Sequence, residues 1–159
     1  MADSVKLYQA KLLTPFAVLG ILIEEDWLTD IEYLPLDTQL LSPTNHLAKE
    51  VCNQLKAYLT EPHFVFDLNL HIGGTTHQRR VWEAIQGVPT GETTSYAEIA
   101  KQLHSAPRAV GRACGANRLP IIIPCHRVIA KNGSLGGFMN ASDGDPLEIK
   151  RWLLQHESA

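Results

Sequence analysis

The chain has 159 residues and a formal net charge of −3, with 45 % hydrophobic and 19 % charged residues. This composition is typical of a folded globular protein and excludes a disordered chain, and no apolar run reaches the roughly 18–20 residues that span a bilayer. The first residues lack a secretion signal, and three cysteines are too few for a disulfide framework. We therefore expect a cytoplasmic protein with free thiols.

The charge is unevenly distributed along the chain. Residues 1–70 contain four lysines and ten acidic residues, whereas residues 71–159 contain ten basic and seven acidic residues. An acidic part joined to a basic part is typical of proteins in which one domain meets a polyanion such as DNA. An ordinary solvated surface also produces this asymmetry, so charge alone leaves both interpretations open.

The first 70 residues predict a small antiparallel sheet followed by a helix. Strands are expected at residues 5–13, 16–24, 27–34 and 64–66. Apolar residues recur at helical spacing from Leu47 to Leu59, after Thr44 or Asn45 as the N-cap and before Pro62. We predict that residues 1–70 form one domain and residues 71–159 a second.

Three helices are predicted between residues 74 and 116, and the last two enclose a short turn. Thr75 or Thr76 can cap the first helix, and helices at 96–103 and 108–116 form a helix-turn-helix. The last helix consists mostly of small residues and carries Arg108 and Arg112 on one face. Close approach of DNA would explain its glycines, and so would tight packing on the protein's own core.

The sequence that follows these helices favours a reactive cysteine. A buried strand is expected at residues 121–123, and Pro124 ends it just before Cys125. A free thiol is only a few per cent ionised at neutral pH, so a nucleophilic cysteine needs a base or a cation nearby. His126 and Arg127, the next two residues, can supply both.

The other two cysteines and the histidines carry no comparable signal. Cys52 and Cys114 lie in predicted helices, where a free cysteine is usually a small buried hydrophobe. No pair of cysteines or histidines has the spacing of metal ligands, so we predict no structural metal.

A series of short motifs extends from residue 74 to residue 157. They are Gly74-Thr75, Gln78, Val81-Trp82, Pro89-Thr90-Gly91, Ser95-Tyr96, Ile99-Ala100, Arg108-Ala109-Val110-Gly111, Asn117, Pro124-Cys125-His126-Arg127-Val128, Gly133, Gly137 and the run Lys150 to Glu157. Together they resemble the O6-alkylguanine-DNA alkyltransferase family. The resemblance implies an α+β fold with a ribonuclease H-like sheet and helix, followed by a mostly helical, winged-helix-like domain that contains the helix-turn-helix.

The resemblance also implies a function in DNA repair. The alkyl group of O6-alkylguanine, and of O4-alkylthymine, would be transferred irreversibly to Cys125 in a single turnover that needs no cofactor. The target nucleotide would be flipped out of double-stranded DNA. The partner would be alkylated DNA and not a membrane, and the protein would act as a monomer.

Roles for individual residues follow from the same resemblance. Cys125 would be the nucleophile, His126 its base through a water, Glu157 the carboxylate that orients His126, and Asn117 the residue that holds the turn. Residues predicted to bind substrate or DNA are Tyr96, Arg108, Ala109, Gly111, Arg112, Val128, Phe138 and Met139. Arg108 would fill the space of the flipped nucleotide, Tyr96 would donate to the guanine ring, and the Val128 backbone would accept from its amine.

The sequence departs from the family pattern at several positions. His77 replaces an aromatic residue, which predicts altered packing between the domains, and Arg118 replaces a proline. Phe138 and Met139 change the substrate pocket, and residues 140–147 have the appearance of an insertion.

Two other functions remain as alternatives. One is a catalytically silent sensor that binds alkylated DNA. The other is a cysteine hydrolase that turns over many times. The number of reaction events per molecule separates all three.

Overall fold

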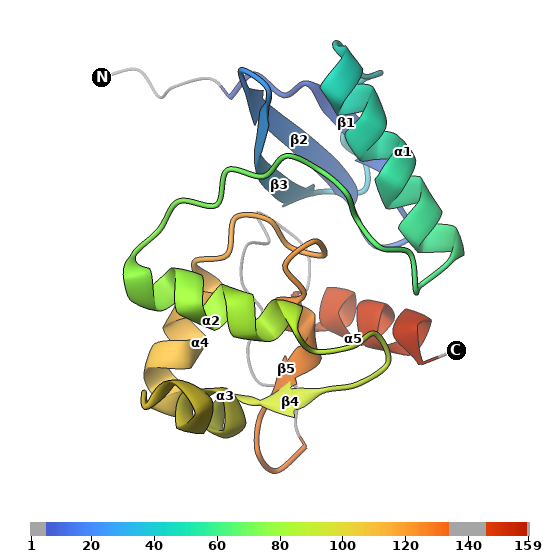
Figure 1. The fold of residues 1–159 in the computed structure, drawn as a ribbon. Helices are drawn as coiled ribbons and strands as arrows, with labels where there is room; N and C mark the ends of the chain where they lie inside the picture. The colour runs from blue at the N-terminus through green and yellow to red at the C-terminus, as the bar shows by residue number, and fades with distance from the viewer. Residues whose placement is uncertain (1–5, 134–145, 159) are drawn as a thin grey trace.

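The computed structural model describes residues 6–133 and 146–158, which form an α+β fold. An antiparallel sheet of order β1-β2-β3 consists of β1 (Ala10–Leu13), β2 (Val18–Glu24) and β3 (Trp27–Leu34). Helix α1 (His46–Thr60) packs against this sheet, and the other helices lie below them in Figure 1. None of the described helices combines the length and the apolar character that crossing a membrane requires.

The first strand is shorter than predicted, because it begins at Ala10 and not near residue 5. Ala10 to Leu13 pair with the first half of β2. Just before them, the Gln9 carbonyl accepts a hydrogen bond from the Thr44 backbone (2.9 Å). The Gln9 backbone N–H donates to the Ile21 carbonyl of β2 (2.8 Å), so Gln9 lies between β2 and the segment that precedes α1.

Helix α1 begins and ends at the predicted signals. The Asn45 side chain accepts a hydrogen bond from the Ala48 backbone (2.8 Å), and the helix ends at Thr60, shortly before Pro62. Its inner face buries Val51, Leu55 and other residues on the sheet.

The predicted strand at residues 64–66 is wrong. This segment is extended, and its Phe64 and Phe66 side chains pack against the core, but it belongs to no strand. The chain pairs with the sheet only further on, where Leu70 bridges Leu28. The alternation of apolar residues correctly predicted that side chains are buried here. It could not show whether a partner strand lies beside the segment, and none of the described strands pairs with residues 64–66.

The C-terminal part of the chain is mostly helical. Its elements are α2 (Thr76–Gln86), β4 (Thr94–Ser95), α3 (Tyr96–Leu103), α4 (Pro107–Gly115), the single-turn 3₁₀ helix η1 (Cys125–Arg127), β5 (Val128–Ile129) and α5 (Pro146–Glu157). Thr75 caps α2 in a capping box with Gln78, Ser95 caps α3, and Pro107 is the first residue of α4. Strands β4 and β5 pair in parallel and bring the start of α3 beside the end of η1.

The predicted strand at residues 121–123 is also wrong. Ile121 has a positive φ of 75°, and the Ile123 backbone donates to the Leu119 carbonyl (2.9 Å), so the segment is a tight buried turn. Asn117 holds it with two side-chain bonds, one to the Ile123 carbonyl (2.9 Å) and one from the Leu119 backbone (2.9 Å). The apolar isoleucines again predicted burial correctly, but not the backbone path.

The two parts of the chain meet along β3 and α5. The Ile31 backbone of β3 donates to the Arg118 carbonyl (2.9 Å), and the Arg118 guanidinium makes two bonds to Asp30 (2.7 and 3.0 Å). On the α5 side, the Phe16 and Trp152 rings lie 4.8 Å apart. Arg118, a departure from the family pattern, thus links the two parts.

Candidate active site

Cys125 opens η1, directly after the turn that Asn117 holds. The residue is 6 % exposed, and the Asn117 side-chain amide lies 3.3 Å from its Sγ. The same amide donates to the Ile123 carbonyl, so one side chain fixes both the turn and the sulfur. The thiol is therefore presented from a rigid, nearly closed position.

Tyr58, His126, Arg127 and Glu157 form a buried carboxylate cluster, in which His126 and Arg127 directly follow the cysteine in the sequence. The Glu157 carboxylate accepts from His126 Nε2 (2.7 Å), from Arg127 Nε and Nη2 (2.8 and 3.1 Å) and from the Tyr58 hydroxyl (2.6 Å). Arg127 also donates to the Val88 carbonyl and to Thr90. We predicted Arg127 as a cation beside the thiol, whereas the structure directs it to Glu157.

These contacts determine which form of His126 is present. A carboxylate only accepts hydrogen bonds, so His126 Nε2 carries the proton. The other ring nitrogen, Nδ1, is buried and has no hydrogen-bond partner in the described part of the chain. In the neutral ring that nitrogen has a free lone pair, which makes it a proton acceptor.

Burial and hydrogen bonding act on the charges in opposite directions. Burial lowers the pKa of His126, and the bond to Glu157 opposes this effect. Burial would raise the pKa of Glu157, but the bonds from His126, Arg127 and Tyr58 hold this pKa well below its usual range. At neutral pH the pair is a carboxylate and a neutral imidazole, which is the form needed for a base.

The Cys125 thiol is neutral at rest. A hydrogen bond with Cys114 and burial raise its pKa well above the usual value, while Asn117 and Lys150 act in the opposite direction. Cys52 is buried as predicted, but Cys114 is only half-buried, and its thiol is a partner of Cys125. The prediction that Cys114 is a small buried hydrophobe was therefore wrong in part.

Sequence reasoning missed Lys150, which is fully buried. Its ammonium donates to the Val128 carbonyl (2.7 Å) and lies 3.5 Å from the Tyr96 hydroxyl. Burial lowers the pKa of Lys150 to about 8 and raises the pKa of Tyr96 to about 12. One buried amine thus joins two groups that we predicted to contact the substrate. A lysine within an apolar helix pattern could have drawn attention, because lysines are almost never fully buried without partners.

Helix α4 has an inner and an outer face. Val110 and Ala113 are buried inside, where the Trp82 indole donates to the Ala113 carbonyl (2.8 Å). The outer face carries four residues predicted to bind DNA, namely Arg108, Ala109, Gly111 and Arg112; both arginines are exposed. A Cβ on Gly111 would have no atom within 4 Å, so packing on the protein's own core does not explain this glycine.

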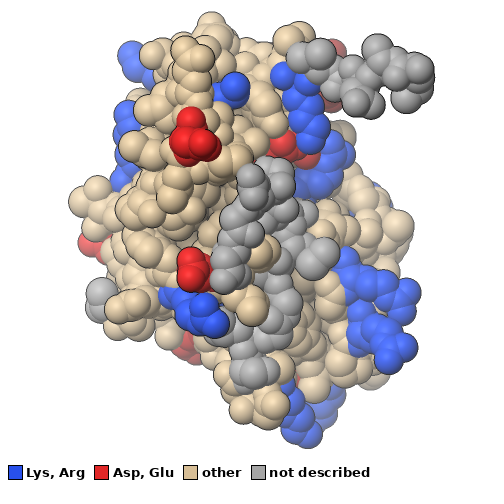
Figure 2. All heavy atoms as spheres, turned by 180° about the vertical axis from the view of Figure 1, so that it is seen from behind, with Lys and Arg blue, Asp and Glu red and all other residues tan. Residues whose placement is uncertain are grey.

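The surface around α4 is basic. In Figure 2, lysine and arginine side chains gather at the lower right, over the end of the molecule formed by α2, α3 and α4. The acidic side chains visible on this face lie mainly over other regions.

The remaining predictions concern positions away from this geometry. His77 contacts Ser105 (2.8 Å) within the C-terminal part, and not the junction with the sheet. Phe138 and Met139 lie outside the described residues, as does most of the predicted insertion. No group of three or more histidine, cysteine or acidic side chains that could hold a metal occurs among residues 6–133 and 146–158.

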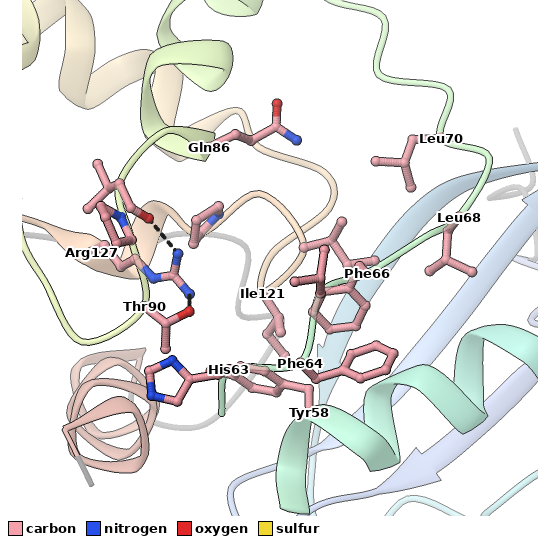
Figure 3. A pocket seen from close by; sticks show the side chains of 15 residues that line it. Tyr58, His63, Phe64, Phe66, Leu68, Leu70, Gln86, Thr90, Ile121 and Arg127 are labelled. Carbon is pink, nitrogen blue, oxygen red and sulfur yellow. Dashed lines mark hydrogen bonds between the residues drawn. The ribbon is translucent and has the colours of Figure 1, made fainter. Parts of the chain in front are cut away.

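A separate pocket of about 320 Å³ lies between the extended segment after α1 and the C-terminal part. Figure 3 shows Tyr58 and Arg127 in its wall, with Thr90 bonded to Arg127. Neither Cys125 nor Tyr96 is among the described residues that line it, so this pocket is not where the thiol faces the substrate.

Comparison with known proteins decides the family. Residues 76–159 match the description "6-O-methylguanine DNA methyltransferase, DNA binding domain". The methylated-DNA–protein-cysteine methyltransferase of Salmonella typhimurium is 34 % identical over 171 residues, which cover 96 % of both chains. The chain belongs to this family. It is a DNA-repair alkyltransferase.

Other members are similar in sequence and in structure. The methylated-DNA–protein-cysteine methyltransferase of Methanosarcina mazei is 45 % identical over 111 residues, covering 69 % of this chain and 67 % of the relative. The crystal structure of Mycobacterium tuberculosis OGT in complex with DNA has a TM-score of 0.80 and 35 % identity, and the match covers 93 % of this chain and 91 % of that one. The similarity to OGT therefore extends over the sheet and α1 as well as the C-terminal helices.

Proposed function

We propose that this alkyltransferase repairs O6-alkylguanine, and also O4-alkylthymine, in double-stranded DNA by moving the alkyl group to Cys125. The observation that carries the proposal is the buried hydrogen bond between His126, the residue after Cys125, and Glu157. It supplies a neutral imidazole whose second nitrogen is available to accept a proton. Alkyl transfer from a neutral resting thiol requires such a base.

The reaction is a single in-line displacement. The Cys125 proton passes through a water to His126 Nδ1, and the sulfur then attacks the alkyl carbon. A carbon–sulfur bond forms as the bond from carbon to O6 breaks, and its electron pair goes to the guanine. The Tyr96 hydroxyl, which burial keeps protonated, donates to the guanine ring and stabilises this charge. The Val128 carbonyl accepts from the exocyclic amine.

DNA is bound by the outer face of α4. Arg108 enters the base stack where the target nucleotide has flipped out. The small residues Ala109 and Gly111 allow close approach in the minor groove, and Arg112 contacts a phosphate. The open space around Gly111 and the basic surface near α4 support this placement.

The wider organisation follows the same proposal. Residues 1–70 form a ribonuclease H-like domain, and residues 71–159 form a winged-helix-like domain in which α3 and α4 are the helix-turn-helix. The protein is a cytoplasmic monomer that needs no cofactor.

The decisive experiment is mass spectrometry after mixing the protein with a duplex that carries O6-methylguanine. Trypsin releases residues 119–127 as one peptide, in which Cys125 is the only cysteine. We expect one methyl group on this peptide, restored guanine and no second turnover, with no change on unmodified duplex. Retention of the modified duplex without methylation would support a sensor, and repeated turnover would support a hydrolase. Either result would contradict the proposal.

A further inference from the structure

The N-terminal part of the chain reaches the carboxylate cluster through one side chain. Tyr58 belongs to α1 and is 1 % exposed, and its hydroxyl donates to Glu157 Oε2 at 2.6 Å. His126 donates to the same oxygen at 2.7 Å. Tyr58 and His126 therefore share one acceptor atom, although they come from different parts of the chain.

The position of Tyr58 is fixed from several sides. His156, the neighbour of Glu157 on α5, donates to the Tyr58 backbone carbonyl (2.7 Å), and the two rings lie 5.1 Å apart. His156 itself stacks on Trp152 at 4.9 Å. Consecutive residues of α5 thus hold both the backbone and the hydroxyl of Tyr58, which is more than packing of an ordinary core tyrosine requires.

The hydroxyl has a chemical consequence for His126. The charged groups that act on this ring are Glu157 and Lys150 of α5 and Arg127 of η1. Glu157 is the one that attracts a proton to the ring. The Tyr58 hydroxyl stabilises the Glu157 carboxylate by donating to Oε2. The carboxylate, which already pairs with Arg127, then attracts a positive charge on His126 less strongly. With Tyr58 in place, Glu157 orients the ring without holding it in the protonated form.

We propose that Tyr58 is a positioning residue of the alkyl-transfer reaction, which keeps His126 oriented and neutral through Glu157. The inference rests on the proposed role of His126 as the base of Cys125. It assigns the N-terminal part a direct effect on the reaction, in addition to its packing against the C-terminal helices.

The test compares Tyr58→Phe with Tyr8→Phe. Tyr8 also donates to a carboxylate at 2.6 Å, but to Glu32 in the sheet, away from the site. For Tyr58→Phe we expect the acid side of the pH profile for single-turnover methyl transfer to move up by about 0.5–1 pH unit. The change makes Glu157 a stronger partner for protonated His126, so a higher pH is needed for the neutral base. The pH profile of Tyr8→Phe should match that of the wild type, and both variants should bind DNA with wild-type affinity.

A second measurement does not depend on activity. NMR titration of the His126 ring in the free protein should give a higher pKa in Tyr58→Phe than in the wild type or Tyr8→Phe. An unchanged ring pKa, or superimposed pH profiles, would overturn the inference. Failure of the proposed function looks different, because the wild type itself would then leave Cys125 unmodified.

Discussion

The carboxylate cluster and the outer face of α4, to which the proposed mechanism assigns the base and DNA binding, have opposite physical arrangements. In the cluster, His126 and Glu157 are 1 % and 2 % exposed, and Glu157 accepts from three side chains. On the outer face, Arg108 and Arg112 are exposed and form no ion pair with any described residue. The Glu157 carboxylate thus has its donors within the protein, whereas the arginines of the outer face remain available to a polyanion.

This difference shows whether the charges of each region find their partners during folding or only on binding. Burial of the Glu157 charge is offset during folding by the groups around it, so the base that we propose, His126, is already oriented before a substrate binds. The arginines of α4 stay hydrated, and their interaction energy appears only on DNA and in a salt-dependent way. Variants of the two regions should therefore fail in different assays.

The largest effect is expected for Cys125→Ala. Methyl transfer should be abolished, since the variant lacks the sulfur that accepts the alkyl group in the proposed mechanism. DNA binding should persist, because α4 is unchanged. Gel-shift affinity and methyl transfer measured on the same duplex will separate the two. As a control, Cys52→Ala, which changes a cysteine buried in α1, should retain both DNA binding and methyl transfer. Methyl transfer by Cys125→Ala would refute the mechanism.

The second largest effect is expected for Glu157→Gln, which should lower the free energy of unfolding. Loss of a buried charge partner for Arg127 typically destabilises a protein by about 3–5 kcal/mol. Because the pKa of Glu157 is lowered in the folded state, its stabilising contribution is present above the usual value of 4.5 and is lost as the pH falls through the folded value. Urea unfolding at several pH values should therefore give a flatter acid profile for the variant.

A matched control exists in the sheet. Glu32 is paired with the exposed Lys6 and accepts from Tyr8, a bond that a glutamine side chain can also accept, so Glu32→Gln should cost less than about 1 kcal/mol. Equal losses for the two variants would show that burial of the cluster is not what makes Glu157 important.

Arg108→Ala tests the other region. Repair of duplex DNA should slow on the order of tenfold, because flipping a base costs a few kcal/mol that the inserted side chain offsets. Transfer from a free O6-alkylguanine base, which needs no flipping, should be unchanged. Arg151→Ala, which removes an exposed charge from α5, is the control. Equal slowing on both substrates would place Arg108 in the chemistry and not in DNA opening.

Gly111→Ala should have the smallest and most diagnostic effect. The new methyl group meets no protein atom, and alanine favours a helix over glycine by about 1 kcal/mol, so thermal stability should rise. DNA affinity should fall, since the methyl group occupies the surface of closest approach. A variant that gains stability and keeps full affinity would contradict the proposed role of this face.

Local signals in the sequence predicted much of the fold. Asn45 and Thr75 were among the predicted caps, and α1 and α2 begin there, because a cap is satisfied by backbone within three residues. The strands at 64–66 and 121–123 were wrong because a strand also needs a partner, which apolar alternation does not reveal.

The candidate site, like the fold, could be predicted from the sequence only in part. Cys125, His126 and Glu157 belong to motifs that could be read from the sequence, and the structure brings His126 and Glu157 together. Tyr58 gave no local signal, and the only hint at Lys150 was a lysine within an apolar helix pattern, since the contacts of both residues are with distant segments. Composition could not show that the guanidinium of Arg127 points to a carboxylate and not to the thiol.

The bond from Tyr58 to Glu157 joins residues 99 positions apart. Closing so long a loop is entropically costly, and contacts of this kind form late in folding. A partly folded chain would thus carry Cys125 before the carboxylate end of its base is in place. For a protein whose thiol can be used only once, this order would delay activation of the nucleophile until the two ends of the chain have come together.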